Sequence, residues 1–193
     1  MLTPTSRNLI LRERDLKSYL ALIVRVDAKN YTTVEDFYQR NAYFFKPIVH
    51  SDLEPGYHNQ SFIYGVPILD LIKAAKTISQ VHTESWNTTS LHNKISENVT
   101  SFTKAGGLLN DDSSGAEERP SDVAQRVFSK ALHSYLRWAL AGGMPGPSIA
   151  DIMAVLGRST TLDRLNDAAE SFREHGVGSL EAEVPQSEAI ASN

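Results

Sequence analysis

A turn rich in Gly and Pro, at residues 142–147, has the composition and position of a ligand-binding element. It follows one predicted helix and precedes Ser148, a good N-cap for the next. A helix N-terminus offers free N–H groups to phosphate or to base edges, and Gly lets a ligand approach the backbone closely. Arg137, one helical turn before the break, could reach the same concavity. The alternative is a helical hairpin that only packs, and the residues alone favour it.

Residues for catalysis or metal binding do not gather anywhere else in the sequence. The phosphate-binding P-loop, the Gly-rich dinucleotide fingerprint and the nucleophile elbow are all missing. The six histidines are scattered, and His82 and His92 are too far apart to share one helical turn, as a metal site on one helix would need. With no cysteine, disulfides, thiolate nucleophiles and cysteine zinc sites are excluded. We therefore predict no catalytic residue, no metal site and no cofactor in this chain.

The composition, with 41% hydrophobic and 22% charged residues, is that of a soluble globular protein. No apolar run approaches the ~18 residues that a membrane span needs. The net charge of −4 argues against a nucleic-acid partner. However, the acidic groups concentrate at 104–118 and 174–193, which leaves the two candidate folded parts near neutral or slightly basic. This distribution permits RNA binding without indicating it.

Apolar residues recur at helical spacing through most of the chain, so we predict an all-α fold. The clearest helix covers 121–141 and ends at Gly142-Gly143. A capping box at Thr32 and Glu35 is predicted to open another helix, and the aromatic run 43–45 is predicted to pack in the core. Residues 48–65 are predicted to be irregular, and no β pattern is visible. The remaining predicted helices cover 7–28, 67–81, 84–103, 149–156, and a last segment that opens at Thr160 or Thr161.

We divide the chain into a first helical part at 1–65, a second at 66–176, and a tail at 177–193. The tail lacks periodicity and basic groups, so we predict that it is disordered. Inside the second part, 104–120 is rich in Gly, Ser and Asp, which favour non-helical backbone. Because so long a loop is uncommon in a compact domain, it is either an insertion or a hinge between two helical halves.

The segment from Leu136 to Leu165 resembles the C-terminal anticodon-binding helices of bacterial-type glutamyl-tRNA synthetases, including the organellar ones. The family's pattern there is Leu-Arg-x-Ala-Leu, a hydroxyl residue and Gly, then a short turn with Pro, an apolar helix ending in Leu-Gly, and Leu-x-Arg-Leu. A weaker likeness extends over roughly residues 9–175. The matching residues are Leu136, Arg137, Ala139, Leu140, Gly142, Pro147, Ile149, Asp151, Leu156, Gly157, Leu162, Arg164 and Leu165.

The resemblance implies two helical sub-bundles of the class I glutamyl-tRNA synthetase anticodon-binding type, in which this turn binds anticodon bases. The positions that carry over are Arg137, Gly146, Pro147 and Ile149. Arg137 would contribute charge or a guanidinium plane, while Pro147, Ile149 and the backbone around Gly146 would form a pocket wall. Splayed single-stranded bases suit such recognition. Many family members have a hydroxyl residue where this chain has Gly146, so only backbone contact would remain there.

The family activates glutamate with ATP on a Rossmann-like domain, whose His-x-Gly-His-type and Lys-Met-Ser-Lys-type motifs do not occur in this sequence. We therefore expect a fragment, a truncated gene model or a free-standing anticodon-binding protein that is inactive alone. ATP and Mg²⁺ would belong to the missing catalytic domain.

The expected function is binding of tRNA for glutamate as the C-terminal part of a glutamate–tRNA ligase. We expect a monomer away from membranes, in the mitochondrial matrix or else in the cytoplasm. The alternative is an inert helical protein-interaction module without RNA binding. The acidic total and the absence of a dense basic stripe support that alternative.

Overall fold

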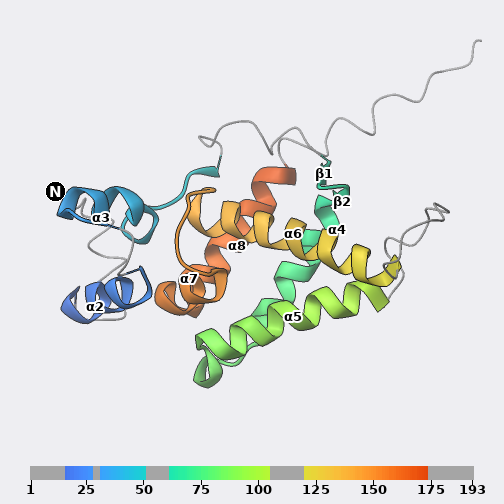
Figure 1. Cartoon of the computed structure of the whole chain (residues 1–193), viewed down its shortest axis with the longest axis horizontal. Coiled ribbons are helices and arrows are strands. Elements are labelled where there is room, and N and C mark those ends of the chain that lie inside the picture. Colours follow the sequence, from blue (N-terminus) through green and yellow to red (C-terminus); the bar gives the residue numbers. More distant parts are fainter. Residues whose placement is uncertain (1–15, 28–30, 51–60, 105–119, 174–193) are drawn as a thin grey trace, which may run out of the picture.

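The computed structural model describes residues 16–27, 31–50, 61–104 and 120–173. In these residues the chain forms an array of helices, which confirms the predicted all-α class (Figure 1). Short 3-10 helices, η1 (Ala42–Phe44), η3 (Thr77–Gln80) and η4 (Thr83–Ser85), join several of them. The α-helices are α2 (Leu16–Asp27), α3 (Val34–Arg40), α4 (Ile68–Lys76), α5 (Thr88–Lys104), α6 (Pro120–Ala141), α7 (Ile149–Leu156) and α8 (Arg158–Phe172).

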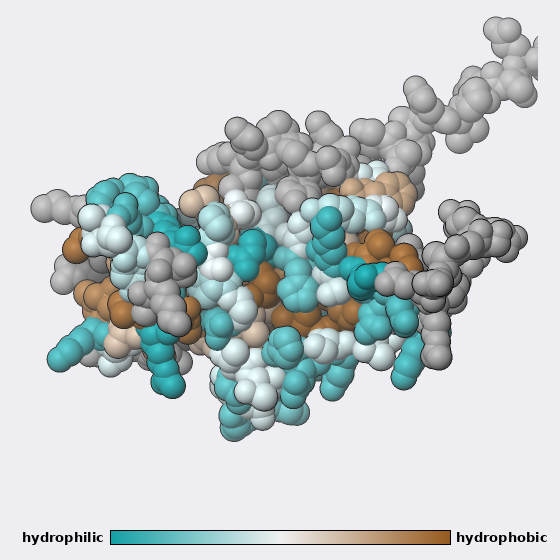
Figure 2. All heavy atoms as spheres, viewed as in Figure 1, coloured by the Kyte–Doolittle hydropathy of each residue, from teal (hydrophilic) through white to brown (hydrophobic). Residues whose placement is uncertain are grey.

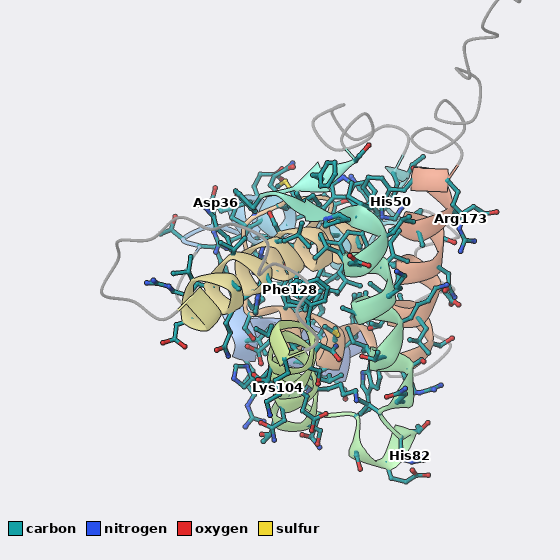
Figure 3. The ribbon with its side chains drawn as sticks, turned by 90° about the vertical axis from the view of Figure 1, so that its right-hand side faces the viewer. Asp36, His50, His82, Lys104, Phe128 and Arg173 are labelled. Carbon is teal, nitrogen blue, oxygen red and sulfur yellow. The ribbon has the colours of Figure 1, made fainter. Side chains whose placement is uncertain are left out.

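Helix α6 lies at the centre of the array and packs against α4, α5, α7 and α8. Figure 3 shows Phe128 of α6 deep in the molecule, where its ring stacks on Phe102 of α5 with the two centroids 3.8 Å apart. The helix predicted at 121–141 is confirmed, and it starts at Pro120, a residue suited to the first helical turn. The apolar residues that recur every three or four positions along α6 are buried: Ala124, Phe128, Leu132, Tyr135 and Ala139.

Helices α2, α3 and η1 form one end of the molecule (Figure 1), and α2 contacts α7. The aromatic run 43–45 is at most 5% exposed, which confirms its predicted place in the core. The Tyr19 hydroxyl donates to the Phe44 carbonyl at 3.1 Å and ties α2 to this run. One hydrophobic core includes residues from both predicted helical parts. The division of the chain at residue 65 therefore stays a prediction.

A small hairpin corrects the expectation that no strand occurs and that 48–65 is irregular. Strand β1 (Phe62–Ile63) pairs antiparallel with β2 (Val66–Pro67), and Tyr64-Gly65 forms the turn. Both turn residues have positive φ, 50° and 78°, as the favoured two-residue hairpin turns require. Two residues a strand are too few for an alternating pattern, and Tyr-Gly is not the usual turn signal. The sequence of this hairpin therefore contains neither the alternation nor the turn residues from which strands are predicted.

Several predicted helix ends differ from the observed ones. The helix predicted at 67–81 is α4 followed by η3, and the helix predicted at 84–103 is η4 followed by α5. The N-cap of α3 is Thr33 and not Thr32, because the Thr33 hydroxyl accepts a hydrogen bond from the Asp36 N–H at 3.0 Å. Helix α8 begins at Arg158, directly after Gly157, whose φ of 79° ends α7.

Three predicted features fall mainly on residues that the structure does not describe: the start of the first helix, the loop at 104–120 and the tail at 177–193. Among the helices that it does describe, none has the length and apolar character needed to cross a bilayer.

Candidate functional site

The turn between α6 and α7 is closed by its own backbone. After α6 ends at Ala141, the N–H of Gly142 donates to the Trp138 carbonyl at 2.9 Å, and the N–H of Gly143 donates to the Arg137 carbonyl at 3.3 Å. Gly142 and Gly143 have φ of 62° and 79°, a left-handed backbone that favours glycine. The following residue, Met144, is 44% exposed. The turn therefore has a defined shape and presents its first residues to solvent.

The Arg137 side chain braces this turn from within. Its Nη1 donates to the Met144 carbonyl at 3.3 Å, and its Nη2 donates to the Pro147 carbonyl at 2.8 Å. The guanidinium fork thus joins the middle of the turn to its last residue, as its planar set of donors allows. The structure brings Arg137 together with the turn, as expected, and also gives it a part in holding the shape of the turn.

Gly146 lies against the hydroxyl of Tyr43, a residue of η1. A Cβ built on Gly146 would overlap Tyr43 Oη, and it would lie 3.7 Å from Nη1 of Arg137. A serine or threonine at this position would therefore meet the Tyr43 hydroxyl, and this close approach explains Gly146. The Tyr43 hydroxyl is buried without a hydrogen-bond partner among the described residues. Burial, with the charge of Asp27 as a smaller cause, raises the pKa of Tyr43, so the phenol is neutral at physiological pH.

Pro147 and Ile149 are buried, so their side chains support the turn from below and do not line an open wall. Between them, Ser148 is the N-cap of α7, as predicted, and its hydroxyl accepts a hydrogen bond from the Asp151 N–H at 3.1 Å. Thr88 of α5 donates to the Asp151 carboxylate at 3.0 Å. The α7 N-terminus is therefore fixed by α5 and α6 together. Contact between RNA and the four predicted site residues stays a prediction.

Arg164 of α8 is a buried arginine that connects three segments of the fold. In the sequence it stood out only as one residue of the Leu-x-Arg-Leu motif. It is 5% exposed, and Nη1 donates to the Leu140 carbonyl at 2.6 Å. Its Nη2 donates to the carbonyls of Tyr43 and Lys46, at 2.7 and 3.2 Å. Burial lowers the pKa of Arg164 to about 10, so it remains charged at neutral pH. Arg164 thus positions both the end of α6 and the segment that carries Tyr43.

The outer face of α6 carries a basic stripe, which we define as Arg126, Lys130, His133 and Arg137. Their spacing of four, three and four residues places them on one face of the helix. The first three are exposed and Arg137 is half-buried, while Asp122 is the one acidic residue of α6. This stripe is sparse, because Arg126, Lys130 and Arg137 are its only Lys or Arg residues, so the expectation that a dense basic stripe is absent stays a prediction. The stripe itself was not among the features predicted from the sequence. Helical periodicity, applied to charges as well as to apolar residues, would have revealed it.

A groove of about 530 Å³ runs between α5 and α6 beside this stripe. Figure 2 shows hydrophobic side chains along the trough between these two helices, with hydrophilic ones on either side. Arg126 and His133 of the basic stripe belong to its rim. The groove is lined by Ile95, Ser96, Val99, Thr100, Asp122, Gln125, Arg126, Ser129 and His133.

Within the described part of the chain, no group of three or more His, Cys, Asp or Glu residues could hold a metal ion. Figure 3 shows His50 and His82 far apart on the molecule. His50 is buried, with its Nε2 3.1 Å from the Ala139 carbonyl and its ring against Trp138. His50 therefore contributes to the packing of its segment against α6.

Comparison with known proteins gives one positive finding. No curated protein and no solved structure matches the chain. A family model described as the anticodon binding domain matches residues 124–169. The matched range contains the four predicted site residues, the whole basic stripe and Arg164. Residues 124–169, which cover most of α6, all of α7 and most of α8, are thus similar to an anticodon binding domain.

Proposed function

We propose that this chain binds tRNA at the anticodon, as the C-terminal part of a glutamate–tRNA ligase. The observation that carries the proposal is the match of 124–169 to the anticodon binding domain, because this range contains the complete turn braced by Arg137. The preference for glutamate tRNA rests on the sequence resemblance between Leu136 and Leu165. Activation of glutamate with ATP and Mg²⁺ would belong to a catalytic domain. We propose a monomer in the mitochondrial matrix, with the cytoplasm as the alternative compartment.

The geometry of the turn supports this proposal. No neighbouring atom lies within 4 Å of the place where a Cβ would stand on Gly143, so a base can approach the backbone there. Met144 and Pro145 are exposed beside it. The unpaired bases of an anticodon loop can be splayed against such a surface and held by their edges. We therefore assign base contact to 142–145 and support of that contact to Pro147 and Ile149.

Arg137 combines positioning with charge. Two of its N–H donors hold the carbonyls of Met144 and Pro147. A guanidinium has five donors, so others remain for a phosphate or a base edge. The same group that shapes the turn can thus neutralise RNA bound to it.

The test is fluorescence anisotropy with a labelled anticodon stem–loop of the tRNA for glutamate, measured at low and high salt. A stem–loop with the same stem and a scrambled loop is the control, because phosphate contacts alone bind both RNAs equally. We expect tighter binding of the native loop at both salt concentrations. Equal affinity for the two loops would refute anticodon recognition.

The second candidate is a protein-interaction module without RNA binding. The exposed apolar side chains of Phe62 and Leu69, 54% and 50% exposed, favour it. This candidate predicts that neither stem–loop binds at physiological salt. Measurable RNA binding under those conditions would count against it.

A further inference from the structure

We infer that the outer face of α6 and the β1–β2 hairpin form a second RNA contact. In it, the basic stripe binds phosphates, while Phe62 and Tyr64 stack on an unpaired base. This inference rests on the proposed tRNA binding and extends it from the turn at 142–147 to a surface that begins outside the matched range. The ligand is a single-stranded segment of RNA.

The hairpin displays two aromatic rings. Phe62 is 54% exposed and Tyr64 is 52% exposed, whereas Ile63 between them is buried in the core. Tyr64 holds a φ of 50°, a conformation that bulky residues rarely adopt. Large exposed aromatic side chains are the platforms on which unpaired bases stack, and such stacking tolerates any base.

The basic stripe meets this aromatic surface at Lys130. The Nζ of Lys130 lies 4.1 Å from the centroid of the Tyr64 ring. Arg126 and His133 lie one helical turn away on either side of Lys130. Lys130 and Arg126 beside exposed aromatic rings match what a single strand offers, with phosphates for these two cations and bases for the rings.

The charges of the neighbouring elements leave the stripe basic. On α6 itself, Asp122 is the one carboxylate, and it lines the groove one helical turn before Arg126. The net positive charge of the stripe therefore comes mainly from Lys130 and Arg137. On α5, Glu97 pairs with Lys94 at 3.3 Å, and on α4, Asp70 pairs with Lys73 at 2.9 Å. The net character of this face therefore favours a polyanion over an acidic or a purely apolar partner.

The stripe also has a suitable direction and length. It runs from Arg126 to Arg137, which at the rise of an α-helix is about 16 Å. Arg137 is the residue that braces the turn. Figure 1 shows the hairpin beside the half of α6 that is farther from that turn. One RNA strand could therefore contact the turn and the hairpin together.

The test uses the full chain and a labelled transcript of the tRNA for glutamate. Phe62→Thr keeps a residue suited to a strand, and Tyr64→Asn keeps one that accepts positive φ, so each removes a ring without disturbing the hairpin. Lys130→Gln removes a charge. Arg25→Gln, on the exposed surface of α2 at the far end of the molecule, is the matched charge control. Circular dichroism melting verifies that each variant is folded.

We expect each ring removal to weaken binding by at least about fivefold, the lower range of the free energy of base–aromatic stacking. Lys130→Gln should reduce the slope of log affinity against log salt by about 1, and Arg25→Gln should leave that slope unchanged. Unchanged affinity in both ring variants overturns the inference. If Phe62→Thr instead abolishes a dimer seen by sedimentation while RNA affinity stays the same, the hairpin is a self-association surface and the inference is also wrong.

The inference and the proposed function can fail separately. In one outcome, wild type binds the native and the scrambled stem–loops equally, and the ring variants lose affinity equally for both. This outcome supports the second RNA contact and refutes anticodon recognition. In the other outcome, wild type prefers the native loop and no ring variant changes that affinity. This outcome supports anticodon recognition and refutes the second RNA contact.

Discussion

The guanidinium of Arg164 donates to the carbonyl of Tyr43 at 2.7 Å, across 121 positions of the chain. The other Nη of the same side chain donates to the Leu140 carbonyl at 2.6 Å, near the end of α6. One buried side chain therefore fixes both the helix end that begins the turn and the segment whose tyrosine packs under it. The shape of the turn depends on residues far outside it.

Arg164→Met should lower the free energy of unfolding by roughly 2–5 kcal/mol. The substitution keeps an apolar stem of similar size but leaves the buried carbonyls of Leu140 and Tyr43 without their donor. Urea denaturation followed by circular dichroism measures this loss. Arg25→Met on the exposed surface of α2 is the control and should change stability little. A loss below about 1 kcal/mol for Arg164→Met would contradict the role assigned to it.

Gly146→Ser should destabilise the fold, and Tyr43→Phe should rescue it. The serine Cβ overlaps the Tyr43 hydroxyl, whereas its distance to the Tyr43 Cζ, 3.4 Å, is near ordinary contact. Removing that hydroxyl alone should be close to neutral, because it has no described partner to lose. A double-mutant cycle should give a coupling of about 0.5–3 kcal/mol. Additive effects of the two substitutions would show that the contact is relieved in some other way.

Stability should fall as pH rises above 10.0, the ordinary pKa of a tyrosine. Burial raises the pKa of Tyr43 and of Tyr135, so in this range the unfolded chain releases protons that the folded chain retains. The stabilisation is complete below pH 10.0 and is lost above it. Arg164 acts in the opposite direction, because burial lowers its pKa from the ordinary value of an arginine to about 10. Because two tyrosines lower the free energy of unfolding in this pH range and one arginine raises it, the net effect is a loss of stability.

Urea midpoints measured on both sides of that pH test this expectation. Tyr135→Phe should make the alkaline fall shallower, since one of the two phenols whose pKa is raised by burial is gone. A wild-type urea midpoint that is constant through the alkaline range would contradict the raised pKa values of Tyr43 and Tyr135.

Arg137→Ala should weaken binding of the anticodon stem–loop by roughly 1–3 kcal/mol if the guanidinium touches a base. Arg137→Lys separates the two roles, because an ammonium keeps the charge but lacks the planar fork that spans the carbonyls of Met144 and Pro147. We expect lysine to restore little of the affinity and the backbone amides of Gly143 and Met144, both hydrogen-bonded to α6 carbonyls, to exchange faster in both variants. Full rescue by lysine would mean that Arg137 acts only as a charge.

The extent to which the sequence predicted the fold depended on the length of each pattern. Helix α6 was predicted almost to the residue because its apolar stripe repeats over about six turns of sequence and is bounded by Pro120 at its start and by Gly142-Gly143 after its end. The β1–β2 hairpin was missed because two residues a strand carry no alternation. The start of α8 was placed too late, since Gly157 ends α7 and precedes α8 without any intervening loop.

The candidate site was predictable only in its local part. Ser148 as N-cap and the turn itself follow from neighbouring residues. The apolar stripe of α7 already indicated burial of Ile149, whereas the carbonyl partners of Arg164 depend on contacts between distant segments, which no local pattern encodes. The absence of a hydroxyl residue at Gly146 was visible in the sequence, but its cause, the Tyr43 hydroxyl, lies in another part of the chain.

The contact between Gly146 and Tyr43 has a consequence for how this protein can diverge. Because a side chain at position 146 and a hydroxyl on the ring at position 43 compete for one space, the two positions are expected to change together during evolution. A lineage that gains serine or threonine at 146 should first lose the tyrosine hydroxyl at 43. A lineage that keeps Tyr43 is expected to keep glycine at 146, because any Cβ there meets the tyrosine hydroxyl.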